Sequence, residues 1–415
     1  MKESTSHKSS VIDAKTNLIP RTQERELRRK VEERPCILVT GARQTGKTTL
    51  LRSSFPGIEY VSFDSILQAA SASESPEAFL QRFTKSVIFD EIQYASPLFR
   101  ALKASIDADR DMKGQYLLTG SQTFELMKGV SDSLAGRIGI MRLETLSARE
   151  IADSGRFDRE ALLQTPFRGG YPELWRSPDI DAGSWFEDYI RTYIERDLKE
   201  LVQVRDLVEF RRFLSAAANR AGQLVNFTDL GRSCGVSPNT AKAWTAALET
   251  SGIMYVLPPW FTNAETRLIK SPKLYFADTG LLCALLNIEH AEDFEKSSSS
   301  GAIWENFVFI ELVKTGGWIP GRTLFFYRDH SGNEVDFVGF SGNRRILVEA
   351  KFSQRIRPER LGFSAISLSG VDGASFEEAK KNKPACFVAA PTAEAAFLSM
   401  KDFTLYDPRM GLVPN

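Results

Sequence analysis

"CILVTGARQTGKTTLLRSSF", residues 36–55, decides the fold of the N-terminal part of the chain. An apolar run is followed by G-x-x-x-x-G-K-[ST] at residues 41–48 and then by the start of a helical pattern. A loop of this kind directs backbone N–H groups at phosphate oxygens from a helix N-terminus, where the helix dipole also favours anions. The stretch therefore predicts a strand, a phosphate-binding loop and a helix.

Two motifs together predict a site for a nucleoside triphosphate. We expect Lys47 to reach the β- and γ-phosphates and the hydroxyl of Thr48 to bind Mg²⁺. A second apolar strand, "VIFDE", ends in Asp90, which would hold Mg²⁺ through water, and Glu91, which would activate the attacking water. The sequence thus predicts ATP and Mg²⁺ as cofactors and ATP hydrolysis as the reaction. The predicted nucleotide-binding residues are Gly41, Ala42, Arg43, Gln44, Thr45, Gly46, Lys47, Thr48 and Thr49.

Further residues are candidates for contact with the γ-phosphate. "LLTGSQ" is a fourth strand, after which Ser121 or Thr119 could touch that phosphate or the attacking water; polar residues that cap a strand end are the alternative. "SLAGRIGIMRL" contains Arg137 and Arg142, and Arg137 is the better candidate for an arginine finger. An ordinary surface arginine is the alternative. A finger that acts between neighbouring subunits would require a homo-oligomer.

Length and composition restrict the class of protein. A chain of 415 residues predicts two to four domains. With 53 basic and 53 acidic residues, the whole chain has no net attraction for nucleic acid or acidic membranes. Three histidines argue against histidine-based triads and zinc sites, and no apolar run approaches the ~20 residues of a membrane span. Four scattered cysteines and a polar N-terminus predict a cytoplasmic protein.

Alternating strands and helical segments predict an α/β fold with a parallel sheet in the N-terminal part. Downstream the pattern becomes helical, and the last section alternates again as one helix and three strands. The predicted organisation is a flexible tail at 1–20, an ATPase core at 21–150, a helical lid or linker at 151–222, a helix-turn-helix unit at 223–270 and a C-terminal α/β domain at 271–415.

The helix-turn-helix stretch, residues 226–257, could place its second helix in a DNA groove. Its charge does not favour that role, since Arg232 and Lys242 are balanced by Asp229 and Glu249. A packing or partner-docking module is an equal alternative. We expect Trp244 to occupy a core position.

"NEVDFVGFSGNRRILVEAKF", residues 333–352, contains a second candidate site. Asp336 lies within one strand, and Glu349 and Lys351 share one face at the end of the next. Two carboxylates and a lysine suit Mg²⁺-dependent phosphodiester cleavage, in which Mn²⁺ could replace Mg²⁺. Glu305, on a preceding helix, could add a third metal ligand. The alternative is a solvated sheet edge.

Several strings make the chain resemble a known family. "VTGARQTGKTTLL", "FDEIQ", "LLTGSQ", "SLAGRIG", "GGYPE", "SPKLYFADTGL", "WENFVFIEL" and "VEAK" resemble AAA-type ATPases of bacteria and archaea with a C-terminal domain of unknown function numbered 4143. The resemblance covers roughly residues 20–410. It implies a P-loop ATPase core, a helical and winged-helix middle, and a C-terminal fold similar to restriction endonucleases, with their D…E-x-K signature.

These patterns predict an ATPase coupled to a nuclease-like domain that acts on DNA. One alternative is a nucleic-acid-binding ATPase whose nuclease fold is catalytically silent. Another is a regulatory ATPase whose C-terminal units dock a protein partner. The expected partners are ATP and DNA, with a protein partner or further copies of the chain as additional possibilities and no membrane.

Overall fold

The N-terminal part forms a five-stranded parallel sheet, which confirms the predicted α/β core. The sheet order is β2-β3-β4-β1-β5, and each neighbouring pair is parallel. Four of these strands were predicted, whereas β5 was not. The strands are β1 (Cys36–Gly41), β2 (Glu59–Ser62), β3 (Val87–Asp90), β4 (Tyr116–Ser121) and β5 (Ile138–Arg142). The computed structural model describes residues 18–121, 124–194, 207–260, 271–329, 332–342, 344–353, 385–391, 398–399 and 404–410, so most of the predicted tail lies outside it.

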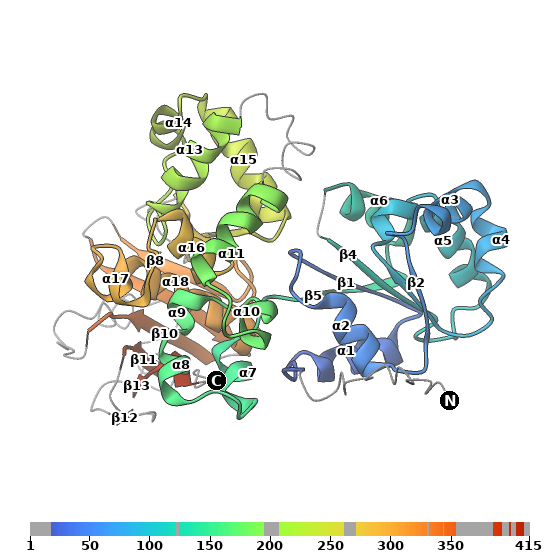
Figure 1. The fold of residues 1–415 in the computed structure, drawn as a ribbon, viewed down its shortest axis with the longest axis horizontal. Coiled ribbons are helices and arrows are strands. Elements are labelled where there is room, and N and C mark those ends of the chain that lie inside the picture. Colours follow the sequence, from blue (N-terminus) through green and yellow to red (C-terminus); the bar gives the residue numbers. More distant parts are fainter. Residues whose placement is uncertain are drawn as a thin grey trace, which may run out of the picture.

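Helices cover both faces of this sheet (Figure 1). Alternate residues of β1 point to opposite faces, so Leu38 joins one apolar cluster and Ile37 and Val39 join the other. Because all five strands are parallel, their carboxyl ends meet at one edge of the sheet, and the motif residues lie at that edge. The helices are α1 (Glu24–Glu33), α2 (Lys47–Ser54), α3 (Ile66–Glu74), α4 (Pro76–Leu80), η1 (Ile92–Ala95), α5 (Leu98–Ala108) and α6 (Phe124–Leu134).

The middle of the chain consists of helices and one antiparallel pair of strands, β6 (Met254–Leu257) and β7 (Lys273–Phe276). Ser237 caps α15 by accepting from Thr240 N, and Gly235 ends α14 with a φ of 78°. The helices are α7 (Ala148–Asp153), α8 (Arg159–Leu163), α9 (Thr165–Arg168), α10 (Pro172–Arg176), α11 (Ala182–Tyr189), η2 (Ile190–Ile194), α13 (Leu207–Ala218), α14 (Phe227–Cys234), α15 (Pro238–Thr250), α16 (Thr279–Leu285) and α17 (Ala291–Lys296).

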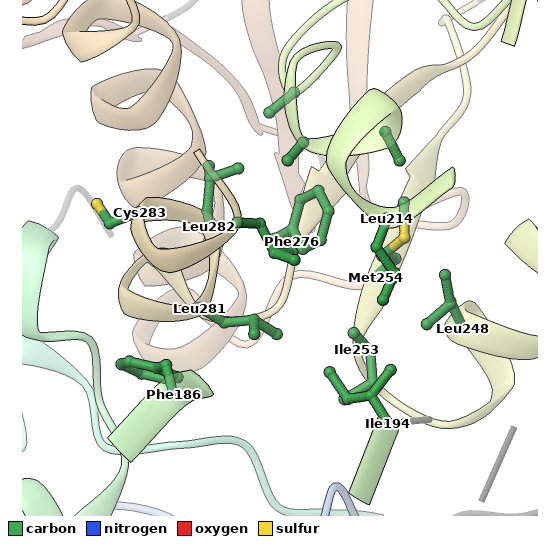
Figure 2. Close-up of a cluster of buried hydrophobic side chains, with 14 of the residues drawn as sticks. Phe186, Ile194, Leu214, Leu248, Ile253, Met254, Phe276, Leu281, Leu282 and Cys283 are labelled. Carbon is green, nitrogen blue, oxygen red and sulfur yellow. The ribbon is translucent and has the colours of Figure 1, made fainter. Parts of the chain in front are cut away.

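A large apolar cluster unites these middle elements (Figure 2). Leu214 of α13 and Leu248 of α15 lie close to Met254 of β6, and Phe276 of β7 lies beside Leu282 of α16. Trp244 is buried in the same cluster, with its ring 5.2 Å from that of Phe210. This confirms the core position expected for that tryptophan. The hairpin and the helices around it therefore form one packed unit.

The C-terminal part is a six-stranded mixed sheet beside a long helix, α18 (Ser300–Gly316). Trp304 of α18 packs on the sheet and donates from Nε1 to the carbonyl of Ala389 at 3.0 Å. The sheet order is β12-β13-β11-β10-β9-β8, of which three strands were predicted. The elements are β8 (Leu324–Arg328), β9 (Glu334–Ser341), β10 (Arg344–Ala350), β11 (Ala385–Ala389), β12 (Leu398–Ser399), β13 (Thr404–Tyr406) and η4 (Pro408–Met410). Within the described ranges, no helix has the length and apolar character that crossing a membrane requires.

Candidate functional site

The backbone of residues 41–46 has the conformation that a phosphate-binding loop requires. Gly41 has a φ of 145°, and a Cβ at this position would lie 2.3 Å from the carbonyl oxygen of Leu143. Gly46 has a φ of 93° and Gln44 one of 62°. In the described part of the chain no side chain caps the N-terminus of α2 at Gly46, so its first N–H groups are available to an anion. The loop therefore fits a bound phosphate.

Lys47 lies inside this loop. Its ammonium donates to the carbonyl oxygens of Ala42 at 2.9 Å and Gly41 at 3.3 Å. Burial lowers the pKa of Lys47 to about 8, and the carboxylates of Glu91 and Asp90 act in the opposite direction. A triphosphate bound to the loop would need a positive charge at the position of this ammonium.

Three hydroxyl groups converge on the carboxylate of Asp90. Thr48 donates from Oγ1 to Oδ1 at 2.6 Å, Tyr60 donates to Oδ2 at 2.8 Å, and Thr119 also donates to Oδ1. The structure thus brings together Thr48 and Asp90, the two residues predicted to hold Mg²⁺, and oxygen ligands of this kind suit that ion. Tyr60 was not predicted, because nothing in its local pattern marks it. Its pKa is raised to about 12, first by burial and then by the hydrogen bond to Asp90.

Glu91 is held in an unusual backbone conformation at the end of β3. Its φ of 54° is rare for a residue other than glycine and costs roughly 1–3 kcal/mol. Gln93 donates to the carboxylate of Glu91, and the backbone N–H of Ser121 lies 3.4 Å from the same oxygen. The Ser121 hydroxyl is buried and has no hydrogen-bond partner among the residues described. Glu91 and Ser121 therefore adjoin each other at the carboxyl ends of β3 and β4.

The two candidate arginines lie at opposite ends of β5. Arg142 is paired with Thr40 beside the loop, but its guanidinium is engaged with Glu144 at 2.5 Å and lies 4.4 Å from the ring centroid of Tyr255. Arg137 precedes the strand, at the end away from the loop, and binds Asp107 through two contacts of 2.8 Å. Five residues at ~3.3 Å each separate it from the loop by about 16 Å. Arg137 cannot reach a nucleotide in its own subunit.

Residues outside the motif hold the loop against the middle of the chain. Arg21 donates to the carbonyl of Thr45 at 2.9 Å and to that of Glu144 at 2.7 Å, and it pairs with Glu150 at 3.2 Å. Glu150 also completes the capping box that starts α7 at Ser147. Arg21 was not predicted, because it lies in a charged stretch that is typical of a solvated helix.

Arg43, within the loop, contacts the helical middle. Its guanidinium lies 5.2 Å from the ring centroid of Tyr193, and its carbonyl lies 3.5 Å from the hydroxyl of Tyr189. A Cβ on Gly252, just after α15, would lie 3.4 Å from the nitrogen of Ala42. The loop is thus in direct contact with α11, η2 and the turn that follows α15.

The C-terminal candidate residues also lie together. The ammonium of Lys351 is 2.6 Å from Oε2 of Glu349 and 3.4 Å from Oδ2 of Asp336, which also accepts from the N–H of Ala350 at 2.9 Å. The pKa of Glu349 is raised to about 8, first by burial and then by the neighbouring Asp336. Burial opposes ionisation of Asp336, but Lys273 and Lys351 hold its pKa below the usual range.

Glu305 joins this cluster through Lys273, which was not among the predicted site residues. The ammonium of Lys273 is 2.9 Å from Oε1 of Glu305, 2.5 Å from Glu334 and 3.8 Å from Oδ1 of Asp336. Burial opposes the charge of Lys273, but these carboxylates raise its pKa above the usual range. In the ranges that the structure covers, no three His, Cys, Asp or Glu side chains are arranged to hold a metal ion. Lys273 lies between the predicted ligands Glu305 and Asp336, so these two carboxylates do not fit a divalent ion as they stand.

Comparisons with known proteins find three family models that match parts of this chain. Residues 33–152 match an AAA domain, residues 159–292 a domain of unknown function (DUF8612) and residues 300–369 a domain of unknown function (DUF4143). This confirms the predicted AAA domain and the predicted domain numbered 4143.

Two mycobacterial proteins are similar to this chain in sequence. The uncharacterized proteins Rv2008c of Mycobacterium tuberculosis and Mb2031c of Mycobacterium bovis are each 33% identical over 319 residues, which cover 76% of this chain and 70% of the relative. Among solved structures, the Walker-type ATPase PABY2304 of Pyrococcus abyssi superimposes with a TM-score of 0.44 at 16% identity, covering 65% of this chain and 96% of that chain.

Proposed function

Because the chain belongs to the protein family of Rv2008c and contains an AAA-type P-loop ATPase domain, we propose that it hydrolyses ATP and transmits its nucleotide state to its C-terminal half. ATP and Mg²⁺ are the ligands that such a domain normally binds. The ATPase would then be a regulatory switch, and the nuclease-like domain would not cleave DNA.

One observation carries the ATPase proposal: Thr48, Asp90 and Glu91 converge beside the phosphate-binding loop. Bound Mg²⁺ would neutralise charge on the phosphates. Thr48 would bind that ion directly, and Asp90 would hold it through water. Glu91, held by Gln93, would orient and deprotonate water, and the hydroxyl of Ser121, which has no partner among the described residues, would donate to the γ-phosphate.

Contacts between the loop and the middle of the chain support the transmission step. Arg43 lies against Tyr189 and Tyr193, and Arg21 ties Thr45 to Glu150. A phosphate that draws Lys47 away from its two carbonyl partners would change the loop to which these side chains bind. The coupling then passes through direct contacts between residues of the loop and the helices.

Phosphate release and ATP affinity test the proposal together. We expect Glu91→Gln to bind ATP with nearly wild-type affinity and to hydrolyse it on the order of 10²-fold more slowly or worse, because it keeps its shape but loses its basic oxygen. We expect Lys47→Ala to lose affinity. Glu59→Gln, an exposed carboxylate on β2, is the matched control. Wild-type hydrolysis by Glu91→Gln would overturn the assignment of Glu91.

A second candidate function is metal-dependent cleavage of DNA by the C-terminal domain. The convergence of Asp336, Glu349 and Lys351, which resembles a restriction-endonuclease-like site, favours it. Wild type, Asp336→Ala and Lys47→Ala would be incubated with labelled single-stranded, duplex and branched DNA and Mg²⁺ or Mn²⁺, with and without ATP. Cleavage lost in Asp336→Ala would establish a nuclease. Normal ATP hydrolysis without cleavage of any substrate would support the regulatory ATPase.

The helices α13–α15 and the hairpin β6–β7 have the order of a winged helix, which we propose as a partner-docking unit. The exposed residues of α15 include one basic side chain, Lys242, so the helix offers little to DNA phosphates. Binding of DNA through many phosphate contacts would weaken by orders of magnitude between 50 and 200 mM salt, on the order of 10³-fold. Partner binding that survives such salt would support docking of a protein.

A further inference from the structure

A lysine ammonium lies at the centre of the C-terminal carboxylate cluster. Lys273 is 2% exposed, and its Nζ is within 4 Å of three carboxylates. These carboxylates come from two other elements, Glu305 from α18 and Glu334 and Asp336 from β9. Lys273 itself comes from the hairpin of the middle unit. The cluster therefore joins three segments that are far apart in the sequence.

The neighbours of Lys273 hold it in this position. Its ammonium lies 5.5 Å from the ring centroid of Phe326, and Tyr275, on the same face of β7, donates to Oε1 of Glu305 at 2.7 Å. On another side the backbone of Gly222 is close to Glu305, since a Cβ at Gly222 would lie 3.3 Å from that carboxylate. By contrast, the side chain of Lys351 is 35% exposed. Of the two ammonium groups, Lys273 is the one enclosed by the fold.

The position of Lys273 conflicts with a divalent ion between two of the predicted ligands, Glu305 and Asp336. Mg²⁺ or Mn²⁺ binds carboxylate oxygens at ~2.0–2.2 Å in an octahedral arrangement. An ion between Glu305 and Asp336 would need the space of an ammonium that already lies 2.9 Å from one and 3.8 Å from the other. Two cations confined there would also repel each other strongly.

We propose that Lys273 is the built-in cation of this cluster and takes the place of a divalent metal ion between Glu305 and Asp336. The inference goes beyond the proposed ATPase, because it concerns which cation the C-terminal carboxylates accept. It also explains how a domain that resembles a metal-dependent nuclease keeps its carboxylates buried and compensated without a metal at Glu305. Glu305 is then a partner of Lys273 and Tyr275 rather than a metal ligand.

Binding of Mn²⁺ alone to the full-length chain tests this assignment. Free Mn²⁺ would be counted by electron paramagnetic resonance, with Asp90→Asn in every variant to remove binding at the nucleotide site. We expect Lys273→Met to bind one more Mn²⁺ than the parent, and Lys273→Met with Glu305→Gln to lose that ion. Lys314→Met is the matched control, because Lys314 is also a nearly buried lysine that pairs with a glutamate, Glu311. No gain in folded Lys273→Met would overturn the proposal.

A second comparison decides the matter if Lys273→Met does not fold. With Lys273 in place, Glu305→Gln should leave Mn²⁺ binding unchanged, because Glu305 already has an ammonium partner. Loss of a bound Mn²⁺ in Glu305→Gln would show that Glu305 is a metal ligand and would overturn the proposal. Failure of the ATPase proposal would appear instead as absent phosphate release, which is measured without reference to the Mn²⁺ count.

Discussion

At the scale of single residues, burial rather than position in a motif marks the groups with unusual chemistry. Glu311 of α18 is 1% exposed, accepts from the backbone N–H of Ala148 at 3.0 Å and lies 3.8 Å from Lys314. Burial raises its pKa to about 7, although Lys314 and the N–H of Ala148 act in the opposite direction. The carboxyl group that joins α18 to the start of α7 thus titrates near neutral pH.

The raised pKa of Glu311 predicts that the free energy of unfolding depends on pH. Its pKa in the folded protein exceeds the ordinary 4.5, so its contribution is full below about pH 4.5 and is lost as pH rises towards 7. We expect Glu311→Gln, whose amide oxygen can still accept from Ala148, to gain stability relative to wild type by on the order of 2 kcal/mol between pH 5 and pH 8. Urea unfolding at both pH values would measure it.

The control for this experiment is Glu32→Gln, which changes an exposed carboxylate on α1 and should shift stability equally at the two pH values. If the difference between Glu311→Gln and wild type were the same at pH 5 and pH 8, Glu311 would not titrate in this range.

At the scale of elements, the phosphate-binding loop is attached to helices outside the sheet. Arg21 is the main link, because one guanidinium holds the loop at Thr45 and the capping box of α7 at Glu150. Burial disfavours the charge of Glu150, but Arg21 and the N–H groups of Ser147 and Thr22 lower its pKa. The carboxylate therefore depends on this partner.

We predict that Arg21→Ala raises the KM for ATP about tenfold, with a smaller effect on kcat, because the loop loses the group that fixes its backbone. It should also lower the free energy of unfolding by roughly 3 kcal/mol, since Glu150 is left buried without its cation. Steady-state kinetics and urea unfolding measure the two effects. Arg21→Lys keeps the positive charge but loses the planar, forked guanidinium. Its KM and its free energy of unfolding should therefore lie between those of wild type and Arg21→Ala.

Arg25→Ala, which removes an exposed arginine from α1, should leave both quantities unchanged. An Arg21→Ala protein that folds and binds ATP as wild type does would show that the loop holds its shape without this link.

At the scale of the whole molecule, the arrangement of β5 determines where Arg137 can act. Because β5 is parallel to β1, the start of β5 lies at the edge of the sheet away from the nucleotide site (Figure 1). An arginine finger at Arg137 therefore requires a second copy of the chain. This agrees with the sequence-based expectation of a homo-oligomer, which stays a prediction.

Mixing two inactive variants tests this arrangement. Arg137→Ala retains an intact phosphate loop, and Lys47→Ala retains the arginine. If Arg137 acts between subunits, the mixture should hydrolyse ATP at least about tenfold faster than either variant alone, given the 10³–10⁵-fold effect of arginine fingers. Phosphate release measures it. Arg110→Ala is the control, because Arg110 binds the same Asp107 and is largely exposed. A mixture no faster than the sum of its parts would argue against the finger.

The sequence by itself determined four of the five strands of the ATPase sheet and the motif residues at their ends. The phosphate loop, Asp90 and Glu91 each follow an apolar strand, and local rules place the ends of parallel strands at one edge. The meeting of Asp336, Glu349 and Lys351 was predictable for a different reason, because β9 and β10 are antiparallel neighbours separated by two residues in the sequence.

Only the tertiary structure decided which partners the buried charged residues have. Arg21 and Glu150 are 129 positions apart, and Lys273 and Glu305 are 32 apart on a strand and a helix of different units. Nothing in a local pattern distinguishes a lysine that will be buried among carboxylates from one on a solvated strand end. That difference arises from the packing of β7 against α18 and β9, where burial makes an unpaired charge too costly to tolerate.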